Sequence, residues 1–545
     1  MTATLLFVLP LLGIAQAAEL SQDQIALRQQ LIQRFDTVTT APPISAQERG
    51  ACLTGLVTDL RDNWGLLEPS DQQRMAEFLA PWGGGSLSPR NLRASGDGPP
   101  PPPPADRDEP CFGHQTNNYI ITDHFSVEWE NGVDQDLAEA FAESLEYSWD
   151  REVTEFGWNR PVGTDEYPML AMISDNDNYA GAYTSVEYCN GEGYVPYIVA
   201  YSGSWSSPTW AEDMACHEFN HTIQFSTSYA PEFWYWEATA IWMEEQVYPS
   251  HNYWTYYVEA YTSNPWIGLT AASQRDQEVF YHMYGASIFN FFLDNWYGGA
   301  DTVKAMWDYA AGRSGQYSLT VWDNVAGVGV DLDWEEIFVG FLAANTVMDF
   351  DEQSVFPSID IHDSVTSLPD GGESSGADEP ESLGQNYIRF DDGLDSGKDL
   401  HVEFQGEAGP DQWFAVLVAT SGRRVVQTVR LELDETHMGD GSIAFQGGDV
   451  YLVVAPWDED AAGYHYNWDN APSWSYSWTA ELGEESQPED TGDPENPDDT
   501  NAADDTGESL GGVGLPGCGC SSGGAAPSGA LVALLALLGL ARRRD

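Results

Sequence analysis

Basic residues are scarce in this chain. Its 545 residues include 87 Asp and Glu but only 21 Lys and Arg, which gives a formal net charge of −66. Only two of the basic residues, Lys304 and Lys398, are lysines. Nucleic-acid binding requires clustered Lys and Arg, and no such cluster exists outside the last few residues. The composition therefore excludes a nucleic-acid partner and fits either a salt-rich environment or an ordinary soluble acidic surface.

Long apolar runs are also missing. The run Leu5–Ile14 is too short to cross a bilayer permanently and precedes Ala15-Gln16-Ala17, a pattern typical of signal-peptide cleavage. The second run, Gly529–Ala541, has 13 residues and ends in the arginine cluster 542–544. It is short for a transmembrane helix, although the positive flank favours a membrane-associated end. We therefore expect residues 1–17 to direct export.

Cysteine is infrequent, with six in the chain, and two of them lie in a Gly-rich C-terminal tail. Four cysteines therefore remain in the folded part, and export would permit them to form disulfide bonds. Sequence alone allows three connectivities. The predicted order of elements favours Cys52 with Cys111 and Cys189 with Cys216.

The chain nevertheless has ample material for folded cores, since 42% of its residues are hydrophobic and 13% are aromatic. Its length indicates more than one domain. Six consecutive prolines, Pro99–Pro104, separate a helical N-terminal part from the rest. We predict a helical propeptide or N-terminal domain (18–95), a Pro-rich linker (96–110), an α+β domain (111–350), a linker (351–384), a β-sandwich (385–483), an acidic disordered stalk (484–515) and a C-terminal anchor (516–545).

Hydrophobic periodicity predicts the elements of these parts. Helices are expected at 24–35, 46–64, 70–82, 136–156, 233–248, 253–262, 284–296, 303–311 and 334–344. Strands are expected at 119–129, 169–173 and 194–201 in the α+β domain, and at 387–390, 401–405, 413–418, 425–432, 450–454 and 474–482 in the sandwich.

The segment His217-Glu218-Phe219-Asn220-His221 carries the strongest chemical signal. Two histidines four residues apart on a helix project from one face and can bind one metal ion, with Glu218 placed to act as a general base. A catalytic zinc site needs a third protein ligand and an open fourth position. The spacing thus predicts a zinc-dependent hydrolase.

A second predicted helix, beginning at Phe233, supplies candidates for the third ligand. Its carboxylates would meet the two histidines if the helices pack antiparallel. Glu237 is the predicted ligand and Glu244 the alternative, although a glutamate in a first helical turn is also commonly explained by the helix dipole.

These residues resemble a known group. The segments His217–Phe225, Trp234–Glu245, Tyr248-Pro249 and Tyr284-Gly285-Ala286 are similar to those of secreted metalloproteases common in myxobacteria, over about residues 115–345. The resemblance implies a zincin-like fold for this region, followed by the β-sandwich.

The second helix also resembles the Trp-x-x-Glu-Gly-x-Ala segment of gluzincins, in which the glutamate binds zinc. Glu237 matches that glutamate, while Ala238 replaces the usual glycine. The resemblance implies that Glu237 is a zinc ligand.

Attack of water on a peptide carbonyl also needs a donor to the developing oxyanion. Tyr284 is the candidate, by its resemblance to a Tyr-Gly pair that opens a later helix in the group, with Tyr281 and His282 as neighbours. A purely packing role for Tyr284 is the competing interpretation.

Two further motifs bear on ligands and location. The run Asp175–Asn178 has oxygen atoms suited to a structural Ca²⁺, although a turn is the interpretation we favour. Pro516-Gly517-Cys518-Gly519-Cys520, with the apolar run and arginines behind it, resembles the myxobacterial C-terminal sorting tag. That resemblance implies export and attachment to the outer cell surface by a sorting machinery, and the competing interpretation is a degenerate tail anchor.

The sequence therefore predicts a surface-anchored zinc endopeptidase acting on proteins or peptides, with His217, His221 and Glu237 on the metal and Glu218 as general base. An aminopeptidase with the same zinc site is the first alternative. The second is a non-enzymatic adhesin or glycan-binding protein in which the histidines are structural.

Overall fold

The structure is a computed structural model that describes residues 20–40, 52–79, 109–176, 179, 181–189, 192–204, 208–272, 277–320, 323, 325, 332–374, 376–461 and 471–483. The described residues all belong to one compact unit, which lies within Met1–Ser486. The predicted signal peptide, nearly all of the Pro-rich linker, the stalk and the sorting segment lie outside the described residues.

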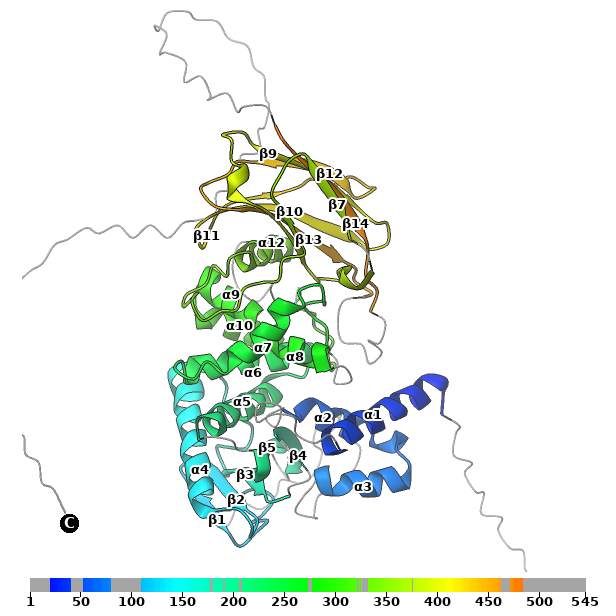
Figure 1. The fold of residues 1–545 in the computed structure, drawn as a ribbon. Helices are drawn as coiled ribbons and strands as arrows, with labels where there is room; N and C mark the ends of the chain where they lie inside the picture. Colours follow the sequence, from blue (N-terminus) through cyan, green and yellow to red (C-terminus); the bar gives the residue numbers. More distant parts are fainter. Residues whose placement is uncertain are drawn as a thin grey trace, which may run out of the picture. The chain divides into compact units, whose positions relative to one another are not determined.

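A five-stranded mixed sheet, in the order β1-β2-β3-β5-β4, forms the first part of the fold (Figure 1). β2 (Phe125–Trp129), β3 (Met169–Ser174) and β5 (Gly193–Tyr201) run parallel. β1 (Tyr119–Ile121) and β4 (Ala182–Cys189) are antiparallel edge strands. The predicted single strand 119–129 is thus two strands joined by a turn, and β4 was not predicted.

Alternation along the strands supplies this sheet with two hydrophobic faces, because successive side chains in a strand point to opposite sides. Met169, Ala171 and Ile173 pack in one core with residues of α4 (Gln135–Trp149) and α5 (Pro208–Thr227). Leu170 and Met172 pack in another with residues of α1 (Gln22–Thr40), α2 (Thr54–Asp62) and α3 (Pro69–Leu79). The N-terminal helices therefore cover one face of the sheet directly.

The helical part that follows α5 packs in the same core as α4 and α5. A glycine pair ends one of its helices, since Gly298 has a φ of 123° that other residues rarely adopt. The last helix begins with a capping box. The side chain of Asp333 accepts from the backbone nitrogen of Glu336, and the side chain of Glu336 accepts from the backbone nitrogen of Asp333. The helices are α6 (Phe233–Val247), α7 (Trp254–Ser263), α8 (Gln277–Gly285), α9 (Ile288–Tyr297), α10 (Ala300–Ala310) and α12 (Trp334–Asn345).

Two further sheets, β11-β10-β13-β8-β6 and β12-β9-β14-β7, enclose a hydrophobic core of their own, as in a β-sandwich. Strands predicted in this region are found within a few residues. The strands are β6 (Asp363–Val365), β7 (Asp370–Glu373), β8 (Asn386–Phe390), β9 (Leu400–Gly406), β10 (Gln412–Ser421), β11 (Arg424–Arg430), β12 (Met438–Ile443), β13 (Val450–Trp457) and β14 (Tyr476–Leu482).

The fold class is α+β, as predicted. The predicted linker 351–384 is wrong in part, because β6 and β7 lie within it and pair with β8 and β14. Both are short and rich in Asp, Gly and Ser, so hydrophobic alternation does not reveal them. In the described part of the chain no helix combines the length and apolarity that crossing a membrane requires.

The predicted disulfide pairs are also wrong. Cys111 is bonded to Cys189 at the end of β4, with their Cα atoms 6.1 Å apart. Cys52 and Cys216 are free and buried. Cys216 points toward Glu152 and the carbonyl of Met243, whereas Cys52 lies at the histidine pair.

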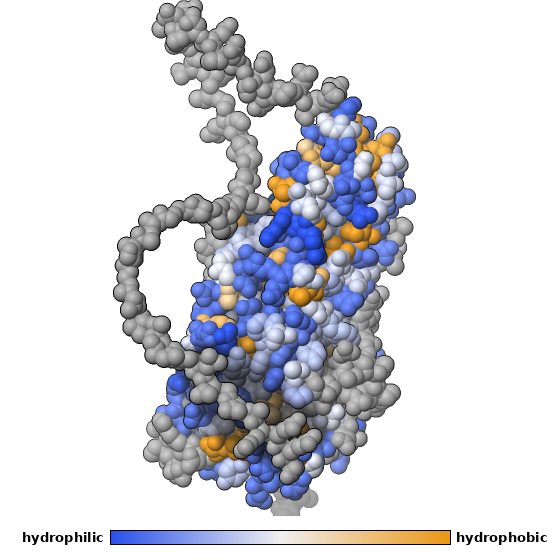
Figure 2. Space-filling model, turned by 60° about the vertical axis from the view of Figure 1, so that its left-hand side comes forward, coloured by the Kyte–Doolittle hydropathy of each residue, from blue (hydrophilic) through white to orange (hydrophobic). Residues whose placement is uncertain are grey.

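Hydrophilic side chains dominate the face shown in Figure 2, with apolar residues in scattered small groups. Most aromatic side chains of the described residues are buried, and the exposed ones are Tyr119, Tyr147 and Tyr188. The high aromatic content therefore serves the cores.

Candidate metal centre

Helices α5 and α6 pack antiparallel and bring the predicted ligands together. His217, in the middle of α5, contacts Glu244, late in α6, whereas Gln224, nearer the end of α5, donates to the carbonyl of Trp236, early in α6. The antiparallel packing on which the choice of the third ligand depended is therefore present. Both helices are buried along most of their length, which explains why their apolar residues do not follow one clear stripe.

The two histidines converge on the carboxylate of Glu237. Its Oε2 lies 3.2 Å from Nε2 of His217 and 3.4 Å from Nε2 of His221. A fourth group, the thiol of Cys52, lies 3.4 Å from Nε2 of His221. The four ligand atoms all lie within 4.8 Å of one another, and all four residues are buried.

Hydrogen bonds on the far side of each imidazole fix its orientation. His217 Nδ1 lies 2.9 Å from Oε1 of Glu244, and His221 Nδ1 lies 2.6 Å from Oε1 of Gln224. Gln224 uses its amide nitrogen to donate to Asn220 and Trp236, so its oxygen accepts from His221. Proton-bearing Nδ1 atoms leave both Nε2 lone pairs facing the cluster, the arrangement that metal-binding histidines require. Glu244, the alternative ligand, therefore orients His217.

The charges at this cluster depend strongly on one another. Burial alone would raise the pKa of Glu237, but the adjacent His221 and His217 lower it to about 2. Burial alone would lower the pKa of His217, but its contacts with Glu237 and Glu244 raise it to about 10. The buried, ionised carboxylate of Glu237 thus strongly favours a positive charge next to it.

Glu218 is fully buried beside the cluster. Its Oε2 accepts hydrogen bonds from the hydroxyls of Thr184, at 2.8 Å, and Thr54, at 3.2 Å. Its Oε1 has no hydrogen-bond partner among the described residues. One oxygen of Glu218 is therefore fixed, and the other is unpaired.

Tyr284 lies near His217, with the two ring centres 6.2 Å apart, and its hydroxyl donates to the carbonyl of Cys52 at 3.2 Å. The prediction that Tyr284 opens a helix is wrong, because it lies one residue before the end of α8. The neighbouring His282 is buried and stacks on Tyr261, and Tyr281 packs against Tyr256 and Tyr257. Of these three candidates, Tyr284 alone lines the cavity at the cluster.

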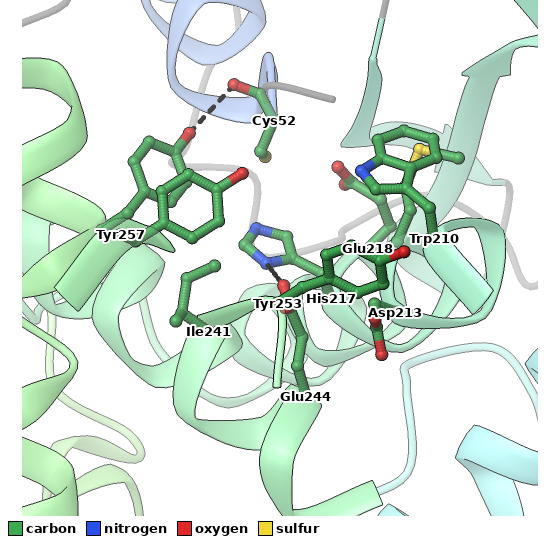
Figure 3. A pocket seen from close by; sticks show the side chains of 11 residues that line it. Cys52, Trp210, Asp213, His217, Glu218, Ile241, Glu244, Tyr253 and Tyr257 are labelled. Atoms are coloured by element: carbon green, nitrogen blue, oxygen red, sulfur yellow. Dashed lines mark hydrogen bonds and ion pairs between the residues drawn. The ribbon is translucent and has the colours of Figure 1, made fainter. Parts of the chain in front are cut away.

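That cavity is small and opens onto Cys52, His217 and Glu218 (Figure 3). Trp210, Ile241, Tyr253 and Tyr257 form much of its wall. The cavity also exposes two acids, Glu244 and Asp213. Burial raises the pKa of Asp213 to about 10, and the negative charge of the nearby Glu244 adds to this effect. Oδ2 of Asp213 has no hydrogen-bond partner among the described residues.

The donor set fits zinc. Ligand atoms at normal zinc distances in a tetrahedral site are roughly 3.3–3.8 Å apart. Three of the pairs here are 3.2–3.4 Å apart, and every pair lies within 4.8 Å. Glu237 Oε1 is buried and also lacks a hydrogen-bond partner in the described residues. Imidazole, carboxylate and thiol are all established zinc ligands.

The predicted calcium run is described only in part, because Asp177 and Asn178 lie outside the described residues. Oδ2 of Asp175 accepts from the backbone of Gly132, and its own backbone nitrogen donates to Glu130. These bonds join the segments that follow the parallel strands β2 and β3, and both the turn and Ca²⁺ binding stay predictions.

Sequence reasoning missed Cys52, Thr54 and Thr184 at this site. Thr184 lies on the unpredicted strand β4, and Cys52 lies far from the motif in the chain. The cysteine count does not single out Cys52, because Cys216 is also free and buried and directs its sulfur to Glu152 instead.

Comparison with known proteins adds one family. A model described as a family of unknown function, DUF6055, matches residues 117–482. A search of curated proteins returns no match.

Two solved structures show limited similarity. The pre-peptidase C-terminal domain of a collagenase from Bacillus anthracis is 13% identical, with a TM-score of 0.17, over 23% of this chain and 100% of that one. A family GH115 4-O-methyl-alpha-glucuronidase is 10% identical, with a TM-score of 0.13, over 51% of this chain and 38% of that one. With such low TM-scores, neither similarity assigns a fold or an activity to this chain.

Proposed function

For a chain that belongs to DUF6055, a family of unknown function, we propose the activity of a zinc-dependent endopeptidase with a zincin-like catalytic region. The observation that carries the proposal is the convergence of His217, His221 and Glu237 on one point, beside a glutamate with one unpaired oxygen. His217, His221 and Glu237 would hold the metal. A bound zinc ion supplies Lewis acidity, which lowers the pKa of water and polarises a carbonyl.

Glu218 acts as the general base and then the general acid. Its Oε2 accepts a hydrogen bond from Thr184 of β4, which leaves Oε1 to take a proton from the attacking water. The same oxygen returns the proton to the amine as the peptide bond breaks. Burial beside polar partners keeps this carboxylate in a fixed position, which general base catalysis requires.

Tyr284 stabilises the negative charge that develops on the carbonyl oxygen. Its hydroxyl already donates to a backbone carbonyl, that of Cys52, within the same cavity. A scissile carbonyl of a substrate would take the place of this carbonyl and accept the same hydrogen bond. This contact favours a chemical role for Tyr284 over simple packing.

The test is the variant Glu218→Gln. It keeps the size of the side chain and removes the base, so we expect hydrolysis of casein to fall by about 10²- to 10⁴-fold while zinc content stays the same. Glu139→Gln, at an exposed position of α4, is the matched control and should retain activity. Undiminished hydrolysis by Glu218→Gln would refute the proposed role.

An aminopeptidase is the second candidate, favoured by the acidic residues Asp213 and Glu244 in the cavity wall. Oδ2 of Asp213 has no hydrogen-bond partner among the described residues, so it is available to accept a hydrogen bond from a free amino terminus. Peptides with free and acetylated amino termini separate the two activities, because only an endopeptidase cleaves both.

The adhesin alternative has less support. A glycan-binding surface needs exposed aromatic side chains, and the three exposed tyrosines of the described residues are scattered over β1, α4 and β4. Secretion and attachment to the outer surface, with the stated sorting machinery as partner, remain part of the proposal on the strength of the terminal sequences alone.

A further inference from the structure

The N-terminal segment Cys52–Thr54 lies across the candidate metal centre. Cys52 is only 4% exposed, and its sulfur belongs to the cluster of four ligand atoms. Figure 3 shows it facing the same cavity as His217 and Glu218, at the start of the pale-blue helix. Cys216, the other free cysteine of the described residues, directs its sulfur to Glu152 and the carbonyl of Met243 instead.

The segment is bound to the sheet in the manner of an added strand. The backbone nitrogen of Leu53 donates to the carbonyl of Ala182 at 2.7 Å, and Cys52 forms a parallel bridge with Ala182. The hydroxyl of Thr54 accepts from the backbone nitrogen of Thr184 at 2.8 Å. β4 is an edge strand, and addition to a sheet edge is a common way to bind an extended peptide. The segment therefore occupies a place where a peptide substrate would be expected.

It also engages each group that the proposed reaction needs. The sulfur of Cys52 lies with the metal ligands, and the hydroxyl of Thr54 donates to the general base Glu218. The carbonyl of Cys52 accepts from Tyr284. Two residues of this segment, Cys52 and Thr54, thus contact the metal position, the base and the oxyanion donor together.

A folded layer holds this segment in place. Leu56, Val57 and Leu60 of α2 are fully buried against the sheet. Arg61 donates to the carbonyl of Val186 at 2.8 Å and to the hydroxyl of Tyr197 at 2.6 Å. The region matched by the family model begins at residue 117, so this layer lies outside it. The catalytic part is thus separable by sequence from the segment that covers it.

We propose that Cys52 is the fourth protein ligand of the metal and that residues 52–54 form a built-in inhibitor that keeps the site closed. The proposal rests on the proposed function. Zinc sites with four protein ligands are closed, whereas catalytic sites keep one position for water. On binding, Cys52 releases its thiol proton to solvent and coordinates as thiolate. Displacing the segment frees the fourth position, Glu218 and Tyr284 in one step.

The first test replaces the metal with Co²⁺ in the full chain and records the absorption spectrum. A thiolate-to-cobalt charge-transfer band is expected in the unaltered protein, lost in Cys52→Ala and retained in the matched control Cys216→Ala. Bound cobalt without this band in the unaltered protein would overturn the proposal.

The second test measures peptide hydrolysis by the same three proteins. An open state populated at about 0.1–10% implies that Cys52→Ala raises kcat/KM by about ten- to a thousandfold, with no such rise for Cys216→Ala. Equal activity of Cys52→Ala and the unaltered protein would overturn the inhibitor while leaving the peptidase intact. A charge-transfer band without hydrolysis by Cys52→Ala would support the ligand and overturn the proposed function.

Thiol alkylation needs no variant and gives an independent readout. With metal bound, Cys52 should resist N-ethylmaleimide, and removing the metal with a chelator should increase its labelling relative to Cys216. Labelling of Cys52 that is the same with and without metal would contradict ligation.

Discussion

The carboxylate of Glu244 contacts His217 on the side of the ring that faces away from Glu237. A carboxylate partner at this position fixes the tautomer and increases the basicity of the metal-binding nitrogen. We expect Glu244→Ala to weaken zinc binding by about 10- to 100-fold, measured by competition with a chelator. Glu245→Ala, on the neighbouring residue that accepts from Trp254, serves as the control. An unchanged zinc affinity in Glu244→Ala would show that this contact does not orient the ligand.

Glu152 makes the stability of the protein depend on pH. Burial raises its pKa from 4.5 to about 8, and its hydrogen bonds with Asn220 and Cys216 only partly oppose this. The folded state therefore binds more protons than the unfolded state between about pH 4.5 and pH 8. Its contribution to stability is present below this window and is lost as pH rises through it, by at most about 1.4 kcal/mol per pH unit.

Glu152→Gln should remove this dependence, because the amide stays neutral in both states. The variant should match the unaltered protein near pH 4.5 and exceed its free energy of unfolding above about pH 8. Urea unfolding at several pH values measures the difference. Parallel pH profiles for the two proteins would mean that Glu152 does not titrate across this window.

Among the helices, α7 and α8 approach so closely that Gly285 has no space for a side chain. A Cβ atom there would lie 2.2 Å from the carbonyl oxygen of Tyr257 and 2.8 Å from the Cβ of Tyr261. The glycine thus sets the distance between the helices and the position of the adjacent Tyr284.

Gly285→Ala should destabilise the protein by about 1–3 kcal/mol, since overpacking forces a backbone shift. The shift should lower kcat through Tyr284 while zinc remains bound, because no metal ligand lies on α7 or α8. Gly312→Ala is the control for helix-end glycines, with open space around its Cβ position but a positive φ of 74°. Loss of zinc together with activity in Gly285→Ala would contradict this separation.

At the scale of elements, the sequence predicts those with strong hydrophobic patterns. Helix α6 and strands β3, β5 and β10 are found where the sequence predicts them, and α5 where the His217–His221 spacing requires a helix. β4 was not predicted because its buried side chains include the polar residues Thr184 and Ser185, which interrupt the hydrophobic pattern of the strand. The polar strands β6 and β7 were not predicted for a similar reason, since they contain almost no apolar residues.

For the site, spacing within one helix predicts the His217–His221 pair and its glutamate, because the helix itself fixes their geometry. Glu237 needed the further assumption that two helices pack antiparallel. Cys52 could not be placed, because its approach depends on an N-terminal layer folding onto the far face of the sheet. No local pattern encodes such a long-range contact.

In the whole molecule, the candidate metal centre lies where three parts of one compact unit meet: the sheet edge β4, the helix pair α5–α6 and the N-terminal segment. The family match covers the first two parts and excludes the third. A centre assembled from separate parts of the chain can be opened by moving one of them, without disturbing the ligands on α5 and α6.

The most direct test of this account is an anomalous-difference map from zinc-grown crystals of the full chain, recorded at the zinc absorption edge. We predict a single strong peak bonded to Nε2 of His217, Nε2 of His221 and Oε2 of Glu237. The sulfur of Cys52 should complete the coordination. No peak at these atoms, or zinc held by other side chains, would contradict the metal centre on which the proposed activity depends.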